Sequence, residues 1–133
     1  MSRPFLAVAL ALLVLAGGAC ATAEAAGPRR VDIRIHHSRF SPEAITVPAG
    51  VPVTFVLRND DPIDHEWLIG DAAFHARHRT GGEAAHADRP DEVSLPALAS
   101  RSTTLVLPPG THVFICHFPG HERYGMVGTV TVR

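Results

Sequence analysis

The chain has 133 residues, 46% of them hydrophobic, which is enough apolar surface for one modest core and leaves no room for a second catalytic domain. Its twelve basic and thirteen acidic residues give a formal net charge of −1. Because a nucleic-acid footprint needs a basic stripe, we expect no nucleic-acid partner.

The amino-terminal segment, residues 1–26, reads as an export signal that is not part of the fold. It has a basic residue at Arg3, an apolar run over residues 5–16, and small residues beyond. This run is shorter than the roughly twenty apolar residues of a membrane-spanning helix. Cys20 leaves a lipoprotein signal as an alternative, although Gly17 stands where that pattern normally has leucine.

The mature domain is predicted as residues 27–133 and is expected in the periplasm, in the cell envelope or outside the cell. It should not insert stably into a membrane unless Cys20 carries a lipid. Within it Cys116 is the single cysteine, whereas exported proteins usually pair their cysteines. An unpaired cysteine in this setting indicates a reactive thiol, an intermolecular bridge or a metal ligand.

Past residue 30 the chain reads as short strands separated by turns. Segments with alternating or β-branched apolar residues lie at 31–35, 45–47, 51–57, 65–70, 102–107, 112–116 and 127–132. Prolines and glycines separate several of them, as in the turn at residues 108–110. About seven to eight short strands in roughly a hundred residues predict an all-β fold, a Greek-key β-sandwich.

One long polar connection, Asp71 to Glu92, interrupts this pattern with glycines and histidines. We expect it to lie on the surface and to contain a helical turn. His75, His78 and His86 gather in it. Such a cluster suits a second metal ion, Cu(II) or Zn(II), but a solvated loop that happens to hold histidines is an equally open interpretation.

The most informative segment is FICHFPGHERYGMVGTV, in which Cys116, His121 and Met126 follow a C-x4-H-x4-M spacing. A thiolate, two imidazoles and a weak axial thioether are the ligands of an electron-transfer copper site. The segment lacks one imidazole of that set. His65, at the start of an expected strand, is the candidate, because a strand end and a loop can meet in a sandwich.

These residues carry a resemblance to a known family. The segments FSPEAITVPAGVPVTFVLRNDDPIDHEW and GTHVFICHFPGHERYGMVGTVTV resemble the cupredoxins, the plastocyanin and azurin superfamily, and most of all their exported bacterial single-domain members. The resemblance covers Val31 to Val132. It implies that four residues bind one mononuclear type 1 (blue) copper ion: His65, Cys116, His121 and Met126.

The resemblance further implies an electron carrier that cycles between Cu(I) and Cu(II), and no enzymatic activity. Backbone N–H groups near Glu66 and Phe118 are expected to hydrogen-bond the sulfur of Cys116 and so to stabilise the reduced state. His121 is expected near the surface beneath an apolar patch. A redox protein such as a cytochrome or an oxidase would dock there weakly and transiently.

Three other kinds of copper protein compete with this interpretation. Multicopper oxidases have a histidine on both sides of the cysteine, whereas Ile115 precedes Cys116 here. The binuclear copper centre of respiratory oxidases needs two cysteines in this loop. An extracytoplasmic copper chaperone or copper-buffering protein stays open as a second hypothesis, because nine histidines are many for this length.

Overall fold

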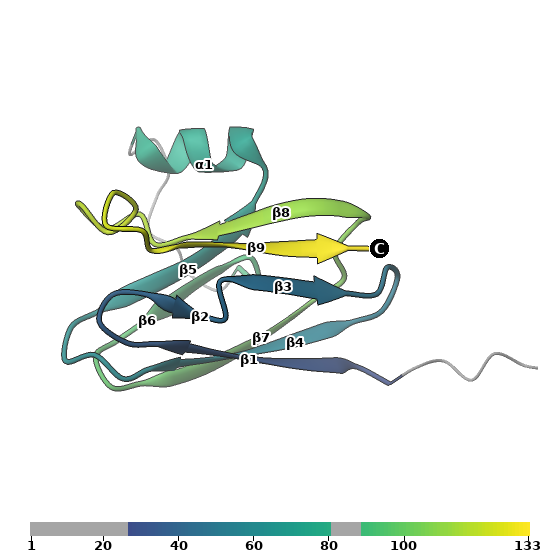
Figure 1. Ribbon diagram of the computed structural model, residues 1–133, viewed down its shortest axis with the longest axis horizontal. Helices are drawn as coiled ribbons and strands as arrows, with labels where there is room; N and C mark the ends of the chain where they lie inside the picture. The colour runs from purple at the N-terminus through teal and green to yellow at the C-terminus, as the bar shows by residue number, and fades with distance from the viewer. Residues whose placement is uncertain (1–26, 81–88) are drawn as a thin grey trace, which may run out of the picture.

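The fold is an all-β sandwich with one helix (Figure 1), and a computed structural model describes residues 27–80 and 89–133 of the chain. The described residues form two sheets of four and five strands. The predicted fold class is therefore confirmed. The predicted export signal, including Cys20, lies outside the described residues, so that it and the domain boundary at residue 27 stay predictions.

The first sheet has the strand order β2-β1-β4-β7. Its strands are β1 (Arg29–Ile35), β2 (Phe40–Ser41), β4 (Val53–Asn59) and β7 (Ser100–Leu105). Strand β4 lies parallel to β1 and antiparallel to β7. Along β4 every second residue is buried, since its apolar side chains alternate at the period of a pleated strand. One face of this sheet therefore supplies half of the core.

The second sheet has the strand order β3-β9-β8-β5-β6. Its strands are β3 (Ala44–Val47), β5 (His65–Gly70), β6 (Glu92–Leu95), β8 (Gly110–Ile115) and β9 (Val127–Val132). Strand β8 pairs antiparallel with both β5 and β9. The start of β5 and the end of β8 consequently lie at the same end of neighbouring strands.

The core between the sheets is aromatic at its centre. Trp67 and Phe114 from the second sheet and Phe55 from the first are 0% exposed. Their ring centroids lie 5.0 Å apart for Phe55 and Trp67 and 5.9 Å apart for Trp67 and Phe114. Burial of one such side chain contributes about 1.5–3 kcal/mol. These contacts fix β5 against β8, which are the strands that carry the site described below.

The connection after β5 is more ordered than the sequence indicated. It begins with α1 (Ala72–Arg79), which lies outside the second sheet (Figure 1), and the carboxylate of Asp71 caps this helix by accepting the N–H of Phe74 at 2.8 Å. Phe74 and His75 are buried. The helical turn expected in this connection is therefore present, and it extends to an eight-residue helix. Residues 81–88, with His86, lie outside the described residues.

No helix within residues 27–80 and 89–133 has both the length and the apolar character needed to cross a membrane.

Candidate metal centre

Three of the four predicted ligands meet at one end of the sandwich. His65 opens β5, Cys116 follows β8, and His121 lies in the loop between β8 and β9. One ligating atom from each lies within 4.8 Å of the others. The Nδ1 atoms of the two histidines are 3.2 Å apart, and the Cys116 sulfur is 3.2 Å from Nδ1 of His121. Two imidazole nitrogens and one sulfur therefore converge on a single point.

The loop that carries Cys116, His121 and Met126 is closed by its own backbone. The N–H of Cys116 donates to the carbonyl of Met126 at 3.2 Å, and the N–H of Met126 donates to the carbonyl of His121 at 3.0 Å. Gly120 and Gly125 adopt φ values of 85° and 93°, which side chains other than glycine rarely tolerate. The loop thus folds back on itself and holds His121 over Cys116.

Met126, the fourth predicted ligand, is 0% exposed and belongs to the hydrophobic core. Its backbone contacts both Cys116 and His121, as described above. The structure therefore places Met126 beside the two loop residues. Its role as a metal ligand stays a proposal.

Electrostatics at the site favour a neutral thiol when no cation is present. Burial raises the pKa of Cys116 to about 11, while the backbone N–H groups of Phe118 and Glu66 hydrogen-bond the sulfur and oppose that rise. These two residues are the ones from which hydrogen bonds to the sulfur were expected. The pKa of His121 is lowered, first by burial and then by the nearby His65. A metal that binds here must displace the thiol proton.

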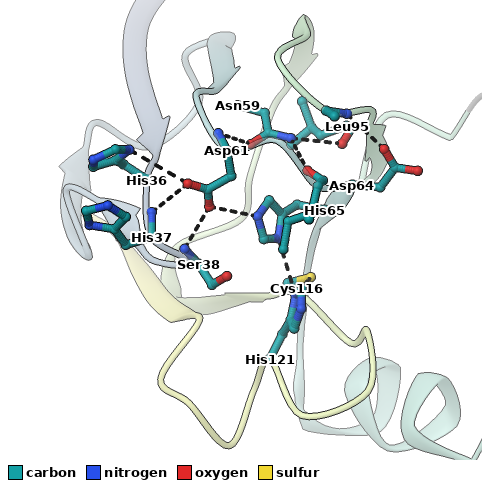
Figure 2. A network of polar contacts seen from close by, with 12 residues as sticks. His36, His37, Ser38, Asn59, Asp61, Asp64, His65, Leu95, Cys116 and His121 are labelled. Carbon is teal, nitrogen blue, oxygen red and sulfur yellow. Dashed lines mark hydrogen bonds and ion pairs between the residues drawn. The ribbon is translucent and has the colours of Figure 1, made fainter.

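Sequence reasoning missed a buried carboxylate that contacts His65. Oδ2 of Asp61 lies 2.9 Å from Nε2 of His65. Figure 2 shows that Asp61 lies on the opposite side of the His65 ring from Cys116. Burial opposes ionisation of Asp61, but the N–H groups of Ser38 and His37, together with His65, give it a lowered pKa overall. The available signal was an aspartate four residues before the candidate histidine, in a stretch that also holds Asp60 and Asp64.

A second buried carboxylate lies beside the cysteine. Glu66 is 4% exposed and accepts the N–H of His117 at 2.8 Å. This contact fixes the backbone immediately after Cys116 to strand β5. Glu66 was predicted only as the position of a backbone donor, so its side-chain role is a further finding of the structure.

The histidines of α1 occupy a site of their own, away from the three converging ligands. His75 is 2% exposed; its Nε2 donates to the carbonyl of Val113 at 3.0 Å, and its Nδ1 lies 2.9 Å from Nε2 of His117. Nδ1 of His78 lies 2.9 Å from the carbonyl oxygen of Phe74. Burial is the main cause that lowers the pKa of both His75 and His117, the latter to about 4.

The donor set selects among metals by its chemistry. Thiolate sulfur and imidazole nitrogen are soft to borderline ligands, which suit copper and zinc and do not suit magnesium or calcium. Two of the three ligands are also shielded from solvent, because His65 and Cys116 are 1% and 0% exposed. The residues present therefore fit a copper ion.

The sequence profile of the cupredoxin-like domain matches residues 6–132 of this chain. The chain therefore belongs to the cupredoxin-like family, as the resemblance of its sequence motifs implied.

Curated relatives include two copper-resistant cuproproteins named CopI. The one from Pseudomonas aeruginosa is 30% identical over 138 residues, which cover 79% of this chain and 76% of that protein. The one from Rubrivivax gelatinosus is 39% identical over 100 residues, with coverages of 71% and 60%. Auracyanin-B of Chloroflexus aurantiacus is 34% identical over 109 residues, but the match covers only 46% of that protein.

Solved structures agree with this assignment. A structure of auracyanin B is 28% identical, has a TM-score of 0.64, and is matched over 79% of this chain and 88% of its own. The dithionite-reduced auracyanin of Roseiflexus castenholzii is 25% identical, has a TM-score of 0.66, and is matched over 80% and 98%. The family assignment thus rests on both sequence and fold.

Proposed function

We propose that this chain is a type 1 copper protein that carries single electrons, with His65, Cys116, His121 and Met126 as ligands. The observation that carries the proposal is the convergence of two imidazole nitrogens and one sulfur within 4.8 Å. The family and the cuproprotein relatives support copper as the metal. A bound copper ion supplies a one-electron couple between Cu(I) and Cu(II).

The contribution of the chain is to hold the ligands still. His65 is anchored on β5 and Cys116 follows the neighbouring β8, while backbone bonds close the loop that carries His121. Electron transfer is fast when neither oxidation state requires the ligands to move. The N–H groups of Glu66 and Phe118 draw charge from the sulfur and thereby favour the reduced state.

The test is spectroscopic. The mature domain loaded with Cu(II) should show the intense visible band and the narrow copper hyperfine splitting of thiolate-bound copper. Cys116→Ser should abolish both, because it replaces the thiolate with a hydroxyl. Thr111→Ser, on the exposed end of β8, is the matched control and should retain both signals. A colourless one-to-one Cu(II) complex of the wild-type protein would refute the proposal.

The second candidate is a copper chaperone or copper-buffering protein, favoured by the names of the two copper-resistant relatives. The two functions can be distinguished by mixing the Cu(I) protein with an apo metal acceptor and, in a parallel experiment, with an oxidised cytochrome. Reduction of the cytochrome supports the electron carrier. Transfer of metal without transfer of electrons supports the chaperone instead.

The histidines of α1 should not contribute to the visible band. The contacts described for His75 and His78 are to His117, Val113, Phe74 and Glu92, not to the Cys116 sulfur. Replacement of His75, His78 and His86 should therefore leave the band in place. Loss of colour would show that the first histidine ligand has been assigned wrongly.

Export and transient docking of a redox partner near His121 complete the proposal. The loop of His121 also carries Phe118, whose ring centroid lies 5.9 Å from that of His121, and Tyr124, which is 67% exposed. This apolar surface suits a brief protein contact. Tyr124→Asp should slow electron exchange with the partner and leave the visible band unchanged. Equal exchange rates would argue for docking elsewhere.

A further inference from the structure

We infer that Asp61 is a positioning residue for the metal centre: it orients His65 so that Nδ1 is the ligand, and its negative charge favours the oxidised metal. The inference deepens the proposed function, and the effect of the Asp61 charge on the metal rests on that function. The orientation of His65 concerns which ring nitrogen carries the proton in the metal-free protein, so it can be tested separately.

Asp61 is held rigidly by donors from a different part of the chain. Its Oδ1 accepts the N–H of His37 at 2.7 Å, and its Oδ2 accepts the N–H of Ser38 at 2.7 Å. The same Oδ2 lies 2.9 Å from Nε2 of His65. Asp61 itself is only 4% exposed. The carboxylate therefore cannot follow the ring if the ring turns, and the ring must adapt to the carboxylate.

The turn that supplies these donors has an uncommon backbone. His37 and Ser38 are consecutive residues with φ values of 52° and 54°, in the left-handed region that side chains other than glycine rarely adopt. Such a conformation is unfavourable unless the surroundings of the residue stabilise it. Successive N–H groups in such a turn form a concave site for an anion. Here the anion is the carboxylate of Asp61 (Figure 2), which accounts for the strained turn.

Orientation follows from hydrogen-bond chemistry. An ionised carboxylate only accepts, so Nε2 of a neutral His65 must carry the proton that it shares with Asp61. The lone pair then lies on Nδ1, which is the atom that faces Nδ1 of His121 at 3.2 Å. Without Asp61 the ring could place its proton on Nδ1, and in that tautomer it cannot bind a metal at the position of the site.

Charge adds a second effect. A carboxylate bonded to an imidazole makes the ring a stronger donor, and removal of such a partner typically costs 10–100-fold in metal affinity. The oxidised ion carries one more positive charge than the reduced ion, so the negative charge of Asp61 stabilises it more. Loss of that charge should therefore raise the reduction potential.

The first measurement uses the wild-type protein without metal. Long-range nitrogen–proton correlation NMR at about pH 8, where an ordinary imidazole is neutral, should show the His65 proton on Nε2. Predominance of the Nδ1–H tautomer would overturn the inference. Because no variant is needed, this result stands even if the variants do not fold.

The second measurement compares Asp61→Asn with Asp60→Asn. Asp60 is the neighbouring carboxylate, and its partners are Arg34 and Arg58, so it is a matched control for the lost charge. In Asp61→Asn we expect the preference for Cu(II) over Cu(I) to fall about tenfold, which raises the potential by about 59 mV. Asp60→Asn should stay close to the wild-type potential.

A purely structural Asp61 would give a different result. Asp61→Asn would then lower the melting temperature and leave both the potential and the His65 tautomer as in the wild type, and that outcome contradicts the inference. If instead the wild-type protein with Cu(II) lacks the visible band, the proposed function fails. The NMR measurement on the metal-free protein still decides whether Asp61 sets the tautomer.

Discussion

The buried pair of His75 and His117 predicts how the metal-free protein responds to acid. Nε2 of His75 donates to the carbonyl of Val113, so its Nδ1 must accept the proton on Nε2 of His117. Both rings are neutral in this arrangement. A further proton would place a charge on a ring whose side chain is only 6% exposed, and Glu122, 3.5 Å from Nδ1, offsets only part of that cost.

The direction and the size of this change in stability follow from the lowered pKa of His117. Its pKa is lowered to about 4, first by burial and then by the charge of His75. Between that value and the ordinary value of about 6.5, the unfolded chain binds a proton that the folded protein does not. Stability therefore falls as pH falls through this window. One group with this shift contributes about 2 kcal/mol of lost stability between about pH 7 and about pH 4.5. The pKa of His75 is also lowered, so His75 contributes a further loss of stability as pH falls.

The assay is urea unfolding of the metal-free protein at several pH values, followed by the fluorescence of Trp67, the single tryptophan. His117→Gln keeps a donor for His75 and removes the titrating ring, so its stability should vary less with pH than that of the wild type. His112→Gln removes a histidine from β8 instead and is the comparison variant. Equal pH dependence in His117→Gln and His112→Gln would refute the reasoning.

Two further predictions concern packing and hydrogen bonding around the site. Gly128→Ala should lower stability by about 1–3 kcal/mol, because the new Cβ would lie 2.1 Å from the ring of Phe114, whereas Gly27→Ala meets nothing within 4 Å and should be neutral in thermal unfolding. Asn59→Ala should cost about 2–3 kcal/mol in urea unfolding. Asn59 is 2% exposed and donates to the carbonyls of Ile63 and Pro96 at 2.8 and 3.0 Å. A loss below about 0.5 kcal/mol would contradict this account of Asn59.

The strands that the sequence predicted well are those with a strong apolar pattern. The predicted segments 65–70 and 127–132 coincide with β5 and β9. Strand β2 was missed because it has only two residues, and β6 was missed because it begins at Glu92, the last residue of the expected polar connection. Helix α1 was underestimated, because it buries only two of its residues, Phe74 and His75, and so lacks an apolar stripe.

The converging ligands were predictable and their supporting residues were not. Cys116 and His121 stand at a fixed spacing in one loop, His65 was a candidate from its place at the start of an expected strand, and the resemblance pointed to the same residue. By contrast, the stretch before His65 holds Asp60, Asp61 and Asp64. Only the fold shows that Asp60 pairs with Arg34 and Arg58 while Asp61 turns inward to His65. Which carboxylate faces a ligand depends on backbone geometry, which a single sequence does not encode as a pattern.

The surroundings of Cys116 also support the proposed electron carrier over an oxidase. An oxidase of this superfamily needs a histidine on each side of the cysteine, both free to bind further metal. Here the residue before Cys116 is Ile115, an apolar side chain that is buried and only 3% exposed. The following residue, His117, already engages His75 with Nε2 and lies with Nδ1 at 3.5 Å from Glu122. Because both ring nitrogens face partners within the chain, His117 stabilises the attachment of α1, and this favours electron transfer at the single site.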